Sequence, residues 1–109
     1  MSAVEPRSAA NEPEKPPVDQ DYIAEFKAQI TAWGFSETEK SMEPFCVLDD
    51  HTHDAEILGL VTCGEISITV GDLARRYRPG DTFELRYGQV HREKVGPHGV
   101  SFVVGRRCR

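Results

Sequence analysis

The sequence lacks long apolar runs and paired cysteines. No stretch approaches the roughly 18 apolar residues of a membrane span, and the start shows no charged-then-apolar secretory signal, so we expect a cytoplasmic protein without a membrane partner. The three cysteines, Cys46, Cys63 and Cys108, form no Cys-x-x-Cys pair. An odd number of this kind favours reduced thiols over a disulfide framework.

Positive charge is also scarce. The 109 residues contain 13 Lys and Arg against 18 Asp and Glu, which gives a formal net charge of -5. Binding to nucleic acid needs a clustered basic surface that neutralises phosphates, so we expect no nucleic-acid partner. The 39% hydrophobic and 28% charged content is typical of a soluble globular domain.

The chain divides into a polar tail and one domain. Residues 1–20 contain four prolines and few large apolar groups, too few to offset chain entropy, so this stretch is predicted to be disordered. Residues 21–109 are predicted to form the domain, and it begins with a helix at about 21–33. Asp21 is the expected N-cap and Gly34 the stop. The helix carries a stripe for packing on a sheet, formed by Ile23, Phe26, Ile30 and Trp33.

After the helix, from about residue 35 to residue 105, the pattern is that of short antiparallel strands. Residues 57–62 are almost entirely apolar, 66–70 alternate strictly, and Gly71-Asp72 is typical of a two-residue hairpin turn. Further turn signals, including one at 96–99, predict seven or eight strands. So many half-buried strands can hide their apolar faces only against one another, which predicts an all-β sandwich or barrel with one N-terminal helix.

Three of the four histidines suggest a metal site. His51 and His53 lie two residues apart, so on an extended strand both imidazoles face the same point. Neutral imidazole binds Zn, Fe, Ni and Cu, and a ligand from a distant strand, such as His91, would complete the site. The alternative is that the histidines are only polar lining of the barrel. His98 lies in a Gly-Pro turn and is expected to be exposed.

The same residues resemble the two sequence motifs of the cupin family. His51, His53, the acid Glu56 and Gly64 are similar to the first motif, a His-x-His pair followed by a glutamate and a glycine. Gly80-Asp81, Gly88 and His91 are similar to the second, a glycine-aspartate pair followed by a glycine and a histidine. The matching residues lie between 51 and 91, and the strand pattern extends the resemblance over about 35–105.

This resemblance implies a double-stranded β-helix, the RmlC-like jelly-roll barrel of small single-domain bacterial cupins of undefined function. It also implies one divalent metal ion, Fe, Mn, Ni or Zn, held by His51, His53 and His91, with Glu56 as the candidate fourth ligand.

The sequence departs from the family pattern at the fourth ligand. Counting back from Gly64, the family glutamate falls at Ile57, and Glu56 comes one residue early. On strict alternation Glu56 faces away from the histidines. A β-bulge between His53 and Glu56 would turn it inward; without one, Glu56 is a surface carboxylate. Both alternatives stay open at the level of sequence.

Three functions fit this reading. The first is a metal-dependent enzyme, of oxygenase or isomerase type, that acts on a small polar metabolite such as a carboxylate. The others are a module that senses a metal or ligand, and a metal-free protein that binds a small molecule. A small-molecule ligand is expected in each case, and edge strands make a homodimer plausible.

Overall fold

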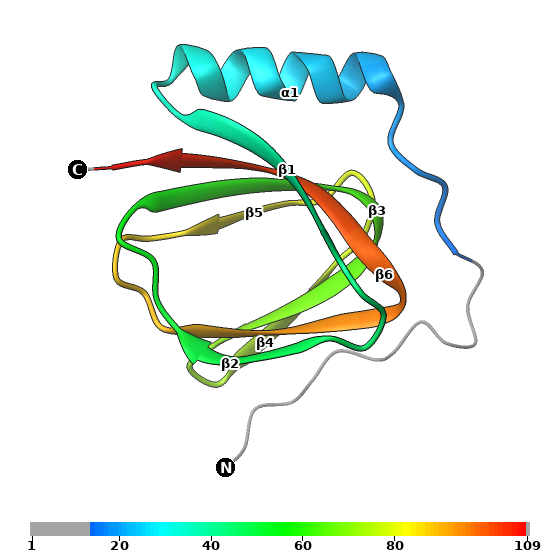
Figure 1. Ribbon diagram of the computed structural model, residues 1–109, viewed down its shortest axis with the longest axis vertical. Coiled ribbons are helices and arrows are strands. Elements are labelled where there is room, and N and C mark those ends of the chain that lie inside the picture. Colours follow the sequence, from blue (N-terminus) through cyan, green and yellow to red (C-terminus); the bar gives the residue numbers. More distant parts are fainter. Residues whose placement is uncertain (1–13, 109) are drawn as a thin grey trace.

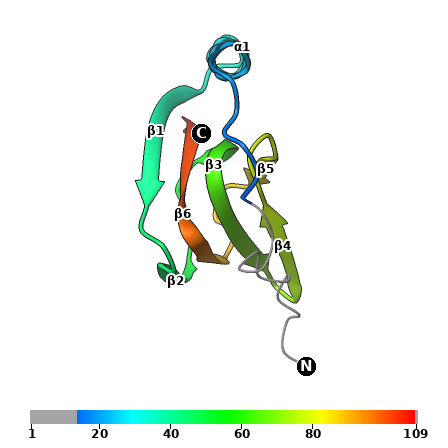
Figure 2. The same cartoon turned by 90° about the vertical axis from the view of Figure 1, so that its right-hand side faces the viewer.

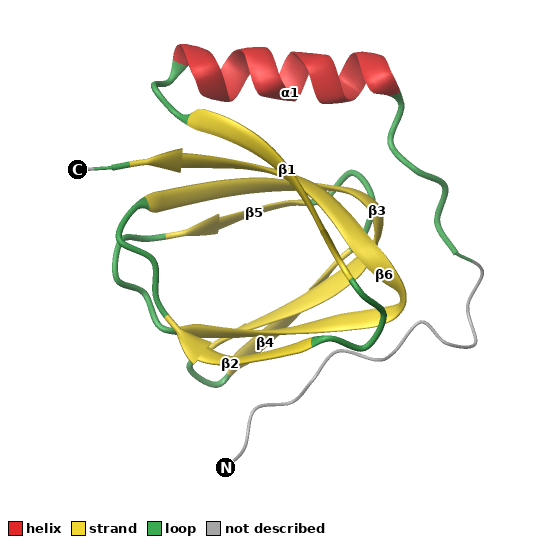
Figure 3. Ribbon diagram, in the orientation of Figure 1, coloured by secondary structure: helices red, strands yellow, loops and turns green. Residues whose placement is uncertain are grey.

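The structure, a computed structural model, describes residues 14–108 and consists there of a helix followed by six strands (Figure 1). The elements are α1 (Gln20–Ala32), β1 (Ser36–Met42), β2 (Val47–His51), β3 (Glu56–Val70), β4 (Leu73–Tyr77), β5 (Thr82–Leu85) and β6 (His91–Arg107). Figure 3 shows that the strands form a barrel and that the helix lies against it from outside. The predicted all-β fold with one N-terminal helix is confirmed.

The two long strands, β3 and β6, pair antiparallel over most of their length and bend together, so each contributes to two layers. In one layer the order is β1-β6-β3-β5, built from the first half of β3 and the second half of β6. In the other it is β2-β6-β3-β4. Figures 1 and 2 show the layers facing each other, and their inner faces enclose the barrel interior.

The bend that separates the layers falls where the register between β3 and β6 shifts, between Val61 and Cys63 and between Gly64 and Ile66. Gly64 has a φ of 73°, and a Cβ there would clash with the carbonyl oxygen of Gly99. Glycine permits both the positive φ and the close approach, and bulges bend a strand without ending its pairing. The predicted turn at 96–99 is therefore wrong, because these residues lie within β6, and the count of seven or eight strands becomes six among the described residues.

The predicted hairpin between β3 and β4 is confirmed. Val70 pairs with Leu73, and Gly71-Asp72 connects them with a φ of 59° at Gly71. A positive φ at the first turn position matches the twist of the flanking strands.

Two clusters of apolar side chains explain the almost entirely apolar stretch at 57–62. Alternate residues such as Ile57 and Val61 belong to the cluster inside the barrel, together with Phe83 and Phe102. Leu60 faces outward and packs with Val103 against the helix. Both faces of this part of β3 are thus covered, which removes the usual alternation with polar residues.

The helix packs on the outer face of the barrel, as the stripe predicted. Its bounds differ: Asp19, not Asp21, is the N-cap, and its side chain accepts a hydrogen bond of 2.7 Å from the Asp21 amide. Ile23 and Ile30 are buried, but Trp33 lies beyond the last helical residue and is 53% exposed. Among the described residues, no helix has the length and apolarity to cross a membrane.

The predicted tail falls mostly outside the described part of the chain, since residues 1–13 are not described. Its end is attached to the barrel, because the Val18 amide donates a hydrogen bond of 2.9 Å to the carbonyl of Thr62. Ordered contacts therefore begin before the helix. The three cysteines are free, and His98 is exposed, as expected. The homodimer stays a prediction.

The packing of the helix predicts different costs for two of its apolar residues. Ile30 has no exposed surface, so Ile30→Ala should leave a cavity and lower the free energy of unfolding by about 2–5 kcal/mol. Trp33→Ala should lower it by less than about 1 kcal/mol, because that side chain is mostly in solvent. Urea unfolding followed by circular dichroism measures both, and equal losses would contradict this docking of the helix.

Candidate metal centre

Pairing between β2 and β6 brings the histidines together. His51 is the last residue of β2 and lies directly opposite His91, the first residue of β6. His53 lies two residues beyond the end of β2, and its carbonyl accepts a hydrogen bond of 2.9 Å from the amide of Gly88, which anchors one loop to the other. The three side chains therefore meet at one end of the barrel.

The three imidazoles are close enough to share one ion. One ligand nitrogen from each of them lies within 4.8 Å of the others. The ring centres of His51 and His91 are 4.1 Å apart, and that of His53 lies 5.3 Å from the first and 5.1 Å from the second. His91 is 1% exposed and the other two are partly buried. The structure thus brings together all three histidines that the sequence singled out.

Backbone carbonyls orient two of these rings. Nδ1 of His51 lies 2.7 Å from the carbonyl oxygen of Asp49, and Nδ1 of His91 lies 3.1 Å from that of Gln89. A carbonyl only accepts, so each Nδ1 carries the proton and donates it. In the neutral ring the lone pair is then on Nε2, the usual arrangement in a metal-binding histidine.

The Nε2 atom of His91 is buried and has no hydrogen-bond partner. A buried acceptor left unpaired costs about 1–3 kcal/mol, so an arrangement of this kind needs a compensating interaction. A metal ion bound by the three imidazoles would supply it, and the residues present fit such an ion.

A bulge in β2 sets the inward direction of His51. Leu48 pairs with Glu93 and His51 pairs with His91, so two residues of β2, Asp49 and Asp50, face the single residue between them on β6. One extra residue shifts the alternation of β2. Leu48 and His51 consequently both line the barrel interior although they are three residues apart.

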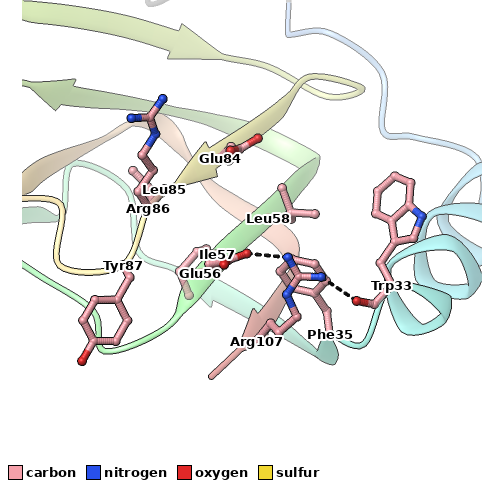
Figure 4. A pocket seen from close by; sticks show the side chains of 10 residues that line it. All are labelled: Trp33, Phe35, Glu56, Ile57, Leu58, Glu84, Leu85, Arg86, Tyr87 and Arg107. Carbon is pink, nitrogen blue, oxygen red and sulfur yellow. Dashed lines mark hydrogen bonds and ion pairs between the residues drawn. The ribbon is translucent and has the colours of Figure 1, made fainter. Parts of the chain in front are cut away.

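Glu56 is not part of the cluster. It begins β3, pairs with Arg107 and is 43% exposed, and its carboxylate accepts a hydrogen bond of 2.6 Å from the Arg107 guanidinium. Figure 4 shows this pair in an outer pocket, where Arg107 also donates to the carbonyl of Trp33. Ile57 instead faces the interior beside His51 and His53. Of the two alternatives, the surface carboxylate describes the structure, because Glu56 binds Arg107 and Ile57, not Glu56, lines the inner cavity.

The carboxylate near the histidines belongs to Glu93, which the sequence reasoning missed. Its Oε2 lies 3.0 Å from Nε2 of His51 and 3.9 Å from Nε2 of His91, and its side chain is 11% exposed. Glu93 follows His91 by two residues on β6, so the two share a face. The spacing His-x-Glu was therefore the available signal, a second pair with the same spacing as His51 and His53.

His51, His53 and Glu93 line one end of a cavity of about 330 Å³. Its remaining walls are mainly apolar, with two cationic side chains; they are formed by Lys40, Met42, Leu48, Ile57, Phe83, Leu85, Phe102, Val104 and Arg106. A larger pocket, of about 500 Å³, lies on the outer surface around Glu56 and Arg107 and contains none of the histidines (Figure 4). The imidazole nitrogens that could bind a metal lie at the smaller, inner cavity, so we place the candidate site there.

Burial lowers the pKa of His53 below its usual value of 6.5, and the neighbouring His91 and His51, followed by Arg106 and Lys40, lower it further. Each of these groups disfavours a positive charge on the ring. His53 is therefore neutral near pH 7, the state in which an imidazole binds metal.

No protein-family model matches the chain, and no curated protein sequence matches it. Among solved structures, a cupin superfamily protein from Desulfitobacterium hafniense matches with a TM-score of 0.61 and 16% identity over 69% of this chain and 68% of that chain. KdgF from Halomonas sp. matches with a TM-score of 0.58 and 19% identity, over 69% and 71%. The polyketide cyclase RemF from Streptomyces resistomycificus matches with a TM-score of 0.59 and 24% identity, over 69% and 55%. These likenesses show that the chain has the cupin fold, a double-stranded β-helix.

The surroundings of His53 predict a low titration midpoint in metal-free protein. The folded pKa is below the unfolded value of 6.5, so the unfolded chain binds more protons between the two values, and folding stability should fall as the pH drops through that window. NMR titration of the ring protons measures the midpoint, with the urea-unfolded chain as reference. A folded midpoint at or above the unfolded one would contradict the buried, electropositive setting.

Proposed function

We propose that this cupin-fold protein binds one divalent metal ion through His51, His53 and His91 and uses it to bind or transform a small molecule in the adjoining cavity. The observation that carries the proposal is the buried Nε2 of His91, which has no partner and lies beside two further imidazoles. An evolved polar lining without a metal would leave this acceptor uncompensated.

Three imidazole nitrogens suit Fe, Mn, Ni or Zn. An ion held by so few protein ligands keeps positions for water or a ligand, where it supplies Lewis-acid chemistry or, as iron, chemistry with O₂. This supports a reaction of oxygenase or isomerase type. The polyketide cyclase among the structural neighbours is an enzyme with this fold, which supports catalysis over sensing alone.

The walls of the cavity narrow the class of ligand. Apolar side chains such as Phe83 and Phe102 form most of the lining, whereas Lys40 and Arg106 provide cationic groups, and Arg106 is also paired with Asp54 at 2.7 Å. Apolar walls favour an apolar molecular body, and cationic groups favour an anionic end. We therefore propose a small carboxylic acid with an apolar body, a narrower class than the polar metabolite expected from the sequence.

The first test is the metal content of protein purified without chelators. Elemental analysis should find about one divalent ion per chain in the wild type, and the His51→Ala/His91→Ala double variant should have lost it, because two of the three nitrogen ligands are gone. His98→Ala is the matched control, since this exposed histidine lies outside the cluster. Equal metal contents in all three proteins would refute the site.

The second test concerns the charge of the ligand. Titration calorimetry of the metal-loaded protein against small apolar acids and their primary amides should show tighter binding of an acid than of its amide. Lys40→Met should weaken acid binding by about five-fold or more, the effect of losing one charge contact of about 1 kcal/mol. Arg106→Met should weaken it by less, because the charge of Arg106 is already paired with Asp54. Lys27→Met on α1, where Lys27 pairs with Glu39, is the control. A preference for the amide would contradict an anionic ligand.

A further inference from the structure

We propose that Glu93 is the fourth metal ligand, so that this site takes its carboxylate from β6 and not from the start of β3. The inference rests on the proposed function, because it concerns the same ion. Glu93 is not among the residues that resemble the cupin motifs. Its distances to the histidines, the hydrogen-bonding capacity of the cluster and its burial support its role as a ligand.

The distances match ligands that share one ion. Ligands at about 2.1 Å from a metal lie about 3.0 Å apart when adjacent in an octahedron and about 4.2 Å apart when opposite. Glu93 Oε2 lies 3.0 Å from His51 Nε2 and 3.9 Å from His91 Nε2, and the three imidazole nitrogens lie within 4.8 Å of one another. The carboxylate of Glu93 therefore lies close enough to His51 and His91 to share an ion with them, and His53 lies beside these two histidines.

The hydrogen-bonding capacity of the cluster calls for a positive charge at that point. With Nδ1 of His51 donating to Asp49, the neutral ring presents a lone pair to the carboxylate of Glu93 at 3.0 Å. Two lone pairs at this distance repel each other unless a cation or a proton lies between them. The repulsion disappears if His51 and Glu93 bind one metal ion.

A proton on His51 is the alternative, and it explains less. A doubly protonated His51 would form an ion pair with Glu93, but Nε2 of His91 would still be buried without a partner, since 3.9 Å from Glu93 is too long for a hydrogen bond. A metal ion satisfies His51, His91 and Glu93 together. A single positive charge on His51 satisfies only two of them.

The burial of Glu93 supports the same assignment. A carboxylate that is 11% exposed costs desolvation energy unless it is paired or bound to a metal. Its place on β6 next to the bulge in β2 keeps it directed into the barrel. At the position of the motif glutamate this chain has Ile57, which forms an apolar wall of the cavity, so moving the acid to β6 keeps the carboxylate and adds apolar surface for the ligand.

Two isosteric variants test the inference. Glu93→Gln should weaken metal binding by at least about ten-fold, whereas Glu56→Gln should change it by less than two-fold, because Glu56 binds Arg107 on the outside. Competition with a chromophoric chelator, using Zn and Mn, measures the dissociation constants without any assay of activity. Equal effects of the two variants, or a larger effect of Glu56→Gln, would overturn the inference.

A crystal structure of the metal-loaded wild type gives a second, independent readout that does not require the variants to fold. Anomalous scattering at the metal edge should place the ion about 2.0–2.2 Å from a carboxylate oxygen of Glu93. A carboxylate beyond 3 Å, or Glu56 at the ion, would overturn the inference while leaving the histidine site intact. A wild type that binds no metal would instead refute the proposed function itself, so the two failures are distinguishable.

Discussion

The antiparallel pairing of β3 with β6 is the interaction on which the rest of the structure depends. Each of the other four strands in the described part of the chain pairs with one of these two, and the shared bend at Gly64 and Gly99 turns one ladder into two facing layers. The site follows directly. The second half of β6 belongs to the layer on which the helix packs. His91, the first residue of β6, lies beside the end of β2 at the mouth of the barrel.

Alternation within this ladder decides which side chains are chemically available. Because successive side chains point to opposite faces, one extra residue in a strand moves every side chain beyond it to the other face of the sheet. The chain has such a residue in β2, between Leu48 and His51, and none at the start of β3. The bulge directs His51 inward, and the regular strand leaves Ile57 inward and Glu56 outward. Glu93 therefore supplies the carboxylate at the histidine end of the cavity, and its strand, β6, pairs at this position with both β2 and β3.

Local patterns in the sequence predicted the features that depend on nearby residues. The Gly71-Asp72 hairpin, the stop at Gly34 and the apolar helix face are all short-range, and the His51 and His53 pair required only the geometry of an extended chain. The number of strands was wrong because Gly96 to Gly99 are turn-forming residues that long-range pairing with β3 holds in a bent strand. The position of a bulge depends on the partner strand as well, so the orientation of Glu56 and the role of Glu93 could not be settled from periodicity.

The hydrogen bonds behind the histidines give the site its direction. The carbonyls of Asp49 and Gln89 fix two rings with Nε2 toward the interior, so the lone pairs are oriented as the barrel folds and not when a ligand arrives. The same convergence of acceptors needs a cation, since lone pairs face one another and Nε2 of His91 has no hydrogen-bond partner. Metal binding would relieve this cost, which couples the ion to the stability of the β2 and β6 ends. The ion would then lie at the polar end of a mostly apolar cavity. An amphipathic ligand that approaches it can place its apolar body only against the walls that include Phe83, Phe102 and Ile57.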